Sequence, residues 1–371
     1  MSEMHGFVAA GFEPVAEAFE AQLARDELGA GFAAIQDGEF VVDLWGGFTD
    51  RAREKPWAEN TLVPVYSTTK PIAALVAALC VERGLLDYDA PVGAVWPEFA
   101  AHGKADLTLA QMLAHQAGLP GFVEPIDPAL WLDPPACAAH LATLSPMWPP
   151  GTVSGYHPLT WGYLIGEVVA RAAGRTLGSL LREDICAGNS IDFAIGLPAA
   201  EHARCAEIRK PSEAPRLGQA TPERKVAFLT KWAAPDRGGP IWREIEIPSA
   251  NGHGTARSVA QLYSVYADRG RLGGRRLLSE ATFAGLTKSR FAGPDLVLPF
   301  EVNWAAGVMR NAQRVYGPNP DGFGHSGWGG SMGLADPDRR ISAAYVMNKQ
   351  SNWLQGDPRA QALVAALFGC L

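Results

Sequence analysis

Two short strand-like segments near the start of the chain cannot form a stable sheet by themselves, and this restricts the possible folds most. Residues 31–36 and 40–48 are rich in β-forming residues, and Asp37-Gly38 between them suits a tight hairpin turn. An isolated two-stranded sheet is only marginally stable in water. Further strand-like segments lie near the other end of the chain, at 303–310, 322–333 and 340–348. We therefore expect one sheet assembled from both ends of the chain.

Helical periodicity is found in much of the remaining sequence. An amphipathic helix is predicted at 14–28, with Gly29 as its C-terminal cap. The same reasoning, with threonine or proline near the start and glycine near several ends, predicts helices at 67–84, 106–117, 158–174, 255–269 and 359–368.

These segments predict an α/β (α+β) fold in which helices flank an antiparallel sheet and a largely helical domain is inserted. With 371 residues, the chain is long enough for two domains. We expect residues 1–88 and 255–371 to form the α/β domain and residues 89–254 the helical domain, with the active site at the seam. Residues 210–250 have weak periodicity and three aromatic residues that suit a flap over a cleft: Phe228, Trp232 and Trp242.

Charge and hydropathy exclude several kinds of partner. The formal net charge is -7, and no run of Lys or Arg with interleaved aromatic residues appears, so nucleic acid is not expected. No apolar stretch reaches the about 18 residues of a membrane-spanning helix, so no membrane partner is expected. The first residues, MSEMHGFVAAGFEP, lack the basic start and apolar core of a secretory signal. We therefore expect the protein in the cytoplasm.

The cysteine and histidine spacing gives no sign of a metal or a disulfide framework. Five cysteines occur without CxxC spacing, and the histidines form no HExxH or HxH pair. We expect reduced thiols and chemistry without a metal or cofactor. The sequence does not indicate the oligomeric state.

The sharpest chemical signal is an SxxK element, Ser67-Thr68-Thr69-Lys70, at the start of an apolar helix. The i, i+3 spacing places Lys70 one turn along, on the same face as Ser67. A serine hydroxyl needs a base to remove its proton, and burial lowers the pKa of a lysine enough for it to serve. Backbone N–H groups at the helix start would also face an oxyanion.

Two further segments carry candidate groups. Tyr156, in Ser154-Gly155-Tyr156-His157-Pro158, could relay the serine proton if a neighbouring lysine lowers the pKa of its phenol. Taken alone, the segment is better explained by an ordinary tyrosine before a helix, with its ring packed and its hydroxyl in water. The glycine-rich stretch at 324–331 allows a backbone to approach a substrate closely, although a bulged hairpin would have the same composition.

In their order along the chain, these three elements resemble the serine β-lactamase and penicillin-binding superfamily, most closely the class C β-lactamases and family VIII carboxylesterases. The segments at 107–119 and 251–254 are also similar to stretches of that family, and the resemblance extends from about residue 12 to the end. It implies Ser67 as nucleophile, Lys70 as general base and Tyr156 as the residue that shares and returns the proton. It further implies an oxyanion hole from the backbone N–H groups of Ser67 and Trp328.

Two departures from the lactamase pattern favour esters as substrates. The asparagine that ends the lactamase tyrosine motif is replaced by Pro158, which has no side-chain donor. The lysine of the lactamase KTG motif is replaced by His325, followed by Ser326 and Gly327, and histidine is mostly neutral at pH 7. We therefore predict hydrolysis of short-chain carboxylic esters through an acyl-enzyme on Ser67, with weak or no β-lactam hydrolysis. Its apolar acyl pocket is predicted to contain Phe122, Trp242 and Trp328.

Three alternatives stay open at this point. The chain could act on β-lactams or D-Ala peptides, as a β-lactamase or penicillin-binding protein does, or it could be a non-catalytic scaffold. A third alternative comes from Gly329-Gly330-Ser331-Met332-Gly333, which matches the GxSxG nucleophile elbow of α/β-hydrolases. That fold requires a histidine after the serine, and none follows His325.

Overall fold

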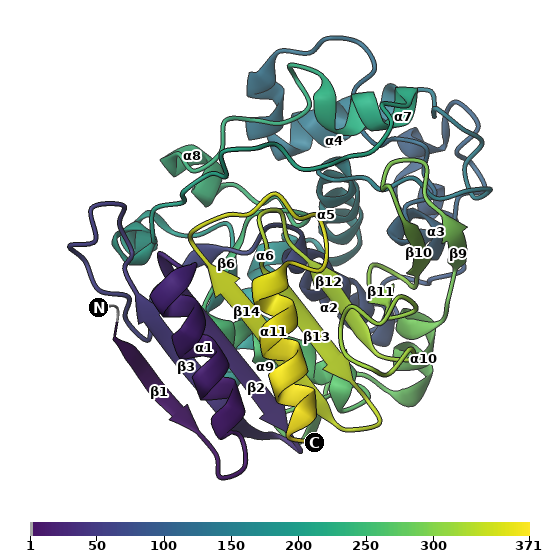
Figure 1. The fold of residues 1–371 in the computed structure, drawn as a ribbon. Coiled ribbons are helices and arrows are strands. Elements are labelled where there is room, and N and C mark those ends of the chain that lie inside the picture. The colour runs from purple at the N-terminus through teal and green to yellow at the C-terminus, as the bar shows by residue number, and fades with distance from the viewer. Residues whose placement is uncertain (1–2) are drawn as a thin grey trace.

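The computed structural model describes residues 3–371. Within this range, nine strands form one antiparallel sheet in the order β1-β3-β2-β14-β13-β12-β11-β10-β9 (Figure 1). The first three strands in sequence are β1 (Met4–Val8), β2 (Gly29–Gln36) and β3 (Glu39–Gly47). The others are β9 (Phe291–Pro294), β10 (Glu301–Trp304), β11 (Met309–Arg310), β12 (Phe323–Ser326), β13 (Met332–Asp336) and β14 (Ile341–Met347). This confirms the prediction of a sheet built from both ends of the chain.

The two groups of strands meet where β2 pairs with β14. Ala30 lies opposite Met347, and Gln36 lies opposite Ile341. Every residue of β14 is buried, so this junction lies inside the molecule. The turn from β2 to β3 has positive φ at Asp37 and Gly38, as the predicted two-residue hairpin requires.

Helices cover both faces of the sheet. The helices α1 (Glu13–Arg25) and α11 (Pro358–Gly369) lie side by side on one face (Figure 1). On the other face, α9 (Ala256–Ala267) packs against β2, β13 and β14. The helix α2 (Thr69–Glu82) contacts both α9 and the helix α5 (Thr160–Ala173). The expected antiparallel sheet flanked by helices is therefore present.

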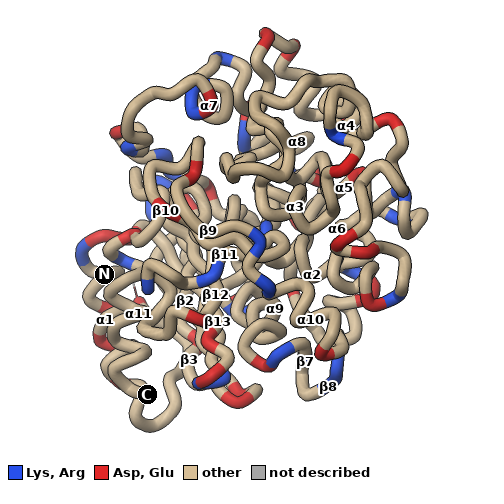
Figure 2. Tube along the Cα trace, turned by 90° about the vertical axis from the view of Figure 1, so that its right-hand side faces the viewer, with Lys and Arg blue, Asp and Glu red and all other residues tan. Residues whose placement is uncertain are grey.

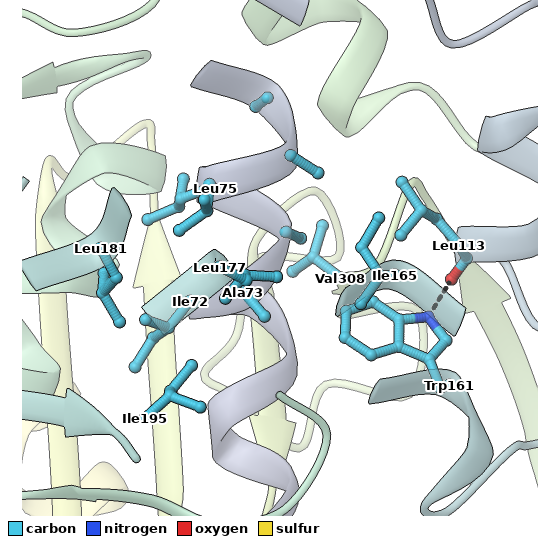
Figure 3. Packing of buried hydrophobic residues seen from close by; sticks show 14 of the residues in the cluster. Ile72, Ala73, Leu75, Leu113, Trp161, Ile165, Leu177, Leu181, Ile195 and Val308 are labelled. Carbon is cyan, nitrogen blue, oxygen red and sulfur yellow. Dashed lines mark hydrogen bonds between the residues drawn. The ribbon is translucent and has the colours of Figure 1, made fainter. Parts of the chain in front are cut away.

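The helix α2 holds the site in place because it is buried on all sides. Residues 69–80 are all buried, as expected for a helix that is apolar around its whole circumference. Figure 3 shows its neighbours, and the indole N–H of Trp161 donates to the carbonyl of Leu113 at 3.0 Å. On one side of α2 lie Leu177, Leu181 and Ile195, and on the other lie Leu113, Trp161, Ile165 and Val308.

The middle of the chain is largely helical and irregular. Its helices are α3 (Leu109–Leu113), α4 (Pro134–Thr143), α5, α6 (Leu177–Leu180), α7 (Pro222–Arg224) and α8 (Pro240–Glu244), and α10 (Glu280–Thr287) follows later. Two small sheets accompany them: β4 (Val63–Pro64), β6 (Gly252–Gly254) and β5 (Phe193–Ile195), and the pair β7 (Arg271–Leu272) and β8 (Arg275–Arg276). Acidic and basic residues are interspersed along the tube in Figure 2.

Three predicted segments differ from the structure. The first helix ends at Arg25 instead of residue 28, and Gly29 begins β2 instead of capping the helix. The helix expected at 106–117 is shortened to α3, because His115 adopts a left-handed backbone with φ of 63°. The strand expected at 303–310 is divided into β10 and β11 by a turn in which Gly307 has φ of 89°.

Candidate active site

Ser67 lies at a sharp change of chain direction. It belongs to a single 3-10 turn, η1 (Tyr66–Thr68), which leads directly into α2. The preceding residue, Tyr66, has φ of 48°, a left-handed conformation that costs energy for a residue with a bulky side chain. The Ser67 side chain is half-buried and lines a cavity. Sequence reasoning did not single out Tyr66, because nothing in its surroundings signals a left-handed backbone.

Lys70 lies next to Ser67 and is fully buried. Its Nζ is 3.3 Å from Ser67 Oγ and donates hydrogen bonds to the carbonyls of Pro158 and Ser249, at 2.9 and 3.1 Å. Burial lowers the pKa of Lys70 well below its ordinary value. A neutral amine has two N–H donors and one lone pair, so two carbonyl contacts leave the lone pair available to the Ser67 hydroxyl. This arrangement suits a general base.

Tyr156 completes the group. The centroid of its ring is 4.6 Å from Lys70 Nζ, and its side chain is hydrogen-bonded to that of Ser67. The structure therefore brings together all three residues predicted from the sequence. The prediction that the pKa of Tyr156 is lowered is wrong. Burial raises the pKa of this phenol, and a neutral Lys70 provides no charge to stabilise a phenolate.

The loop that carries Tyr156 is held by Asp295, a residue that sequence reasoning missed. One carboxylate oxygen of Asp295 accepts hydrogen bonds from the backbone N–H groups of Tyr156, Val297 and Leu298 at 2.8–2.9 Å. The other oxygen accepts from the hydroxyl of Ser154 at 2.8 Å. Asp295 is 8% exposed. This carboxylate thus fixes the tyrosine loop to the loop between β9 and β10.

The third predicted segment forms the opposite wall of the cavity. A Cβ atom at Gly327 would lie 2.2 Å from the carbonyl oxygen of Val65, so only glycine fits beside the turn that carries the serine. His325 is buried, and its Nδ1 lies 2.8 Å from the carbonyl of Ser326. Burial lowers the pKa of His325 to about 3, so the ring is neutral, as predicted. Trp328 is half-buried and lines the cavity.

The cavity beside Ser67 is mainly apolar. Of the three aromatic residues predicted for the acyl pocket, only Trp328 lines it. The prediction is wrong for Phe122 and Trp242. Both side chains are almost fully buried, and Trp242 packs against Tyr66 instead of facing the cavity. The apolar lining comes mostly from loops and short strands: Leu159, Phe228, Leu298, Phe300, Met309, Trp328 and Leu354.

Ser331, the serine of the GxSxG match, has a different environment. It is buried, and its hydroxyl donates to the carbonyl of Val65 at 2.7 Å and lies 3.1 Å from the Thr68 hydroxyl. It is followed by the strand β13, whereas a nucleophile elbow is followed by a helix. The environment of Ser331 indicates that it braces the turn that carries Ser67.

Other expectations concern metals, thiols and membranes. Across residues 3–371, no three His, Cys, Asp or Glu side chains converge in a way that would ligate a metal ion. Cys80, Cys137 and Cys186 are free and buried, while Cys205 and Cys370 are free and partly buried. None of the helices in this part of the chain combines the length and apolar character needed to cross a membrane.

Comparison with known proteins finds similarity along nearly the whole chain. The β-lactamase family model matches residues 15–367. The esterase/β-lactamase LipL of Mycobacterium tuberculosis is 34% identical over 354 residues, which cover 91% of this chain and 81% of LipL. A solved penicillin-binding protein homolog from Caulobacter crescentus is 49% identical, with a TM-score of 0.97 and full coverage of both chains. A solved family VIII carboxylesterase is 41% identical, with a TM-score of 0.92 and the same coverage.

Proposed function

Because the chain belongs to the β-lactamase family, we propose that it is a serine hydrolase that cleaves short-chain carboxylic esters through an acyl-enzyme on Ser67. One observation carries this proposal: the buried Lys70 amine lies 3.3 Å from Ser67 Oγ, and two backbone carbonyls occupy its N–H groups. Such an amine can take up the serine proton.

In the proposed first step, Ser67 Oγ attacks the ester carbonyl carbon while its proton passes to Lys70 Nζ. The alkoxide then leaves with the phenol proton of Tyr156, and the lysine ammonium returns its proton to the phenolate. The raised pKa of Tyr156 favours this order, because the phenol stays protonated until the alkoxide leaves. Water then hydrolyses the acyl-enzyme through the same groups in reverse, which releases the acid and restores Ser67.

We propose that the backbone N–H groups of Ser67 and Trp328 form the oxyanion hole. Ser67 lies in the first turn before α2, where backbone N–H groups lack partners within the helix. The turn that contains Trp328 is fixed beside it, since Gly327 N–H donates to the carbonyl of Ser331 at 2.7 Å. A preorganised pair of donors of this kind stabilises the tetrahedral intermediate.

Esters are the proposed substrates, and β-lactams are the alternative. His325 is neutral where a β-lactamase has a cationic lysine, and Pro158 has no side-chain donor. A charge-assisted contact of about 1.5–3 kcal/mol is thereby absent from this wall. The names of LipL and of the family VIII carboxylesterase support ester hydrolysis. The word β-lactamase in the LipL name and the similarity to a penicillin-binding protein homolog support β-lactams as the alternative substrates. The domain division at 88/89 and 254/255 and a cytoplasmic location remain predictions.

The test combines variants with covalent probes. We expect Ser67→Ala and Lys70→Ala each to remove nearly all hydrolysis of p-nitrophenyl butyrate, and Tyr156→Phe to slow it about 10²–10⁴-fold. Intact-protein mass after incubation with a fluorophosphonate and with a labelled penicillin separates the alternatives. An adduct with the fluorophosphonate alone supports the esterase, and adducts with both support β-lactam binding. Absence of both adducts would show a non-catalytic scaffold.

A further inference from the structure

One cation faces the active-site cavity from a loop that sequence reasoning interpreted only as a flap. Arg237 lies between the π-helical turn η8 (Lys225–Leu229) and α8, and it lines the cavity that contains Ser67. Its guanidinium carbon is 5.6 Å from the centroid of the Trp328 ring. The side chain is partly buried. Arg237 therefore belongs to the same wall as Trp328.

Arg237 has no anionic partner in the protein. Among residues 3–371, it makes neither a hydrogen bond nor an ion pair, whereas many other arginines pair with a carboxylate. Of the described residues that line the cavity, none is Asp or Glu, and no other is Lys or Arg. Burial also lowers the pKa of Arg237, although a guanidinium stays protonated. A partly buried cation without an ion pair carries some of the cost of lost hydration, and an anion in the cavity would relieve that cost.

We propose that Arg237 binds a carboxylate on the acyl part of the substrate, and that the substrates are half-esters of dicarboxylic acids. The planar guanidinium matches a carboxylate with two parallel hydrogen bonds. One cation in a mainly apolar cavity fits a ligand group with a single negative charge. This inference rests on the proposed ester hydrolysis and adds the class of acid.

The proposal also offers a substitute for the positive charge that a β-lactamase lysine would provide at the position of His325 on β12. His325 is buried and neutral, so the strand provides no cation to the cavity. Arg237, on the loop before α8, lines this cavity instead, and it also lines the neighbouring outer cleft. In this proposal the anchor for a carboxylate lies on a loop instead of the sheet, so the charge must lie at a different place along the substrate.

The first experiment compares two esters that differ in one charge, mono-p-nitrophenyl adipate and its methyl-capped diester. We expect wild-type protein to prefer the charged half-ester, and Arg237→Gln to reduce the ratio of the two kcat/KM values about 10–100-fold, mainly through KM. Arg237→Lys should retain part of the preference. Added salt should weaken the wild-type preference. Arg243→Gln is the matched control, since Arg243 lies on the same segment but lines a neighbouring outer cleft only.

The second experiment does not depend on turnover. Calorimetry with Ser67→Ala measures binding of hexanoate and of its neutral analogue hexanamide, with and without Arg237→Gln. Preferential binding of hexanoate that disappears with Arg237→Gln supports the carboxylate site. If this result is found and neither ester is hydrolysed, the proposed ester hydrolysis is rejected while the carboxylate site stands. Equal binding of hexanoate with and without Arg237, or a kcat/KM ratio unchanged by Arg237→Gln, would overturn the assignment.

Discussion

Asp295 provides the sharpest test of how the tyrosine loop is positioned. Its carboxylate does not line the cavity, yet it binds the backbone N–H of Tyr156 at 2.9 Å and the hydroxyl of Ser154 at 2.8 Å. It also accepts from the N–H groups of Val297 and Leu298. Replacing Asp295 therefore loosens Tyr156 without removing any group that touches the substrate.

The structure gives the size of the expected effect. Hydrogen bonds to a charged group contribute about 1.5–3 kcal/mol each, but bonds within one network are not additive. Asp295→Ala leaves three N–H groups and one hydroxyl without their acceptor, and we expect the free energy of unfolding to fall by about 3–5 kcal/mol. Asp295→Asn keeps one oxygen for the N–H groups, and its amide can donate to Ser154 Oγ. We expect a fall of about 1–2 kcal/mol for this variant.

Activity separates positioning from simple destabilisation. A positioned acid–base group contributes about 10²–10⁴-fold, so a displaced Tyr156 should lower kcat about 10–100-fold in Asp295→Ala and less in Asp295→Asn. The matched control is Asp336→Ala at the end of β13. Asp336 is 1% exposed and accepts from the Asn319 amide at 2.7 Å and from the Asp338 N–H at 3.0 Å. Urea unfolding and kcat for p-nitrophenyl butyrate are measured on each variant. Wild-type kcat in Asp295→Ala, or an equal loss in Asp336→Ala, would refute the reasoning.

Three further predictions follow from buried groups. Burial lowers the pKa of Lys70, so kcat/KM should rise with pH through an acid limb well below the ordinary lysine value of about 10.4; a limb near that value in the pH profile would contradict a neutral amine. Burial raises the pKa of Glu27 to about 7 from about 4.3 in the unfolded chain, so the folded state binds an extra proton between these values, and stability is lost as pH rises toward 7. Glu27→Gln should flatten this dependence in denaturation experiments at pH 5 and 7.5. His325→Lys should increase nitrocefin hydrolysis about 10–100-fold, and an assay that finds no gain would show that our account of this wall is wrong.

The sequence predicted those parts of the site that depend on local geometry. Ser67 and Lys70 lie three residues apart at a helix start, and that spacing alone places them on one face. Tyr156 could be assigned only through the family resemblance, because its contact with Lys70 comes from tertiary structure. The direction of its pKa shift was wrong for the same reason: burial outweighs the neighbouring amine, and burial is not visible in the sequence.

Other parts of the site could not be predicted because they depend on packing between distant loops. Asp295 lies 139 positions from Tyr156 in a segment without any motif. An aromatic residue in a loop either lines a cavity or packs in the core, and composition does not distinguish the two; Trp242 and Phe122 are both in the core. Arg237 is likewise a single charge in a loop of weak periodicity. The fold was easier to predict, since alternation, turns and caps are local signals.

The pairing of β2 with β14 has a consequence for how the enzyme is made. Gln36 emerges early in synthesis, but its partner Ile341 follows only after the helical middle has been completed. At the usual speed of translation the interval is roughly 15–60 s. Throughout it, the SxxK serine is already synthesised while the strand and turn that face it are not. A ribosome-bound or prematurely terminated chain without β12 and the turn at Gly327 therefore lacks the wall that lies opposite Ser67.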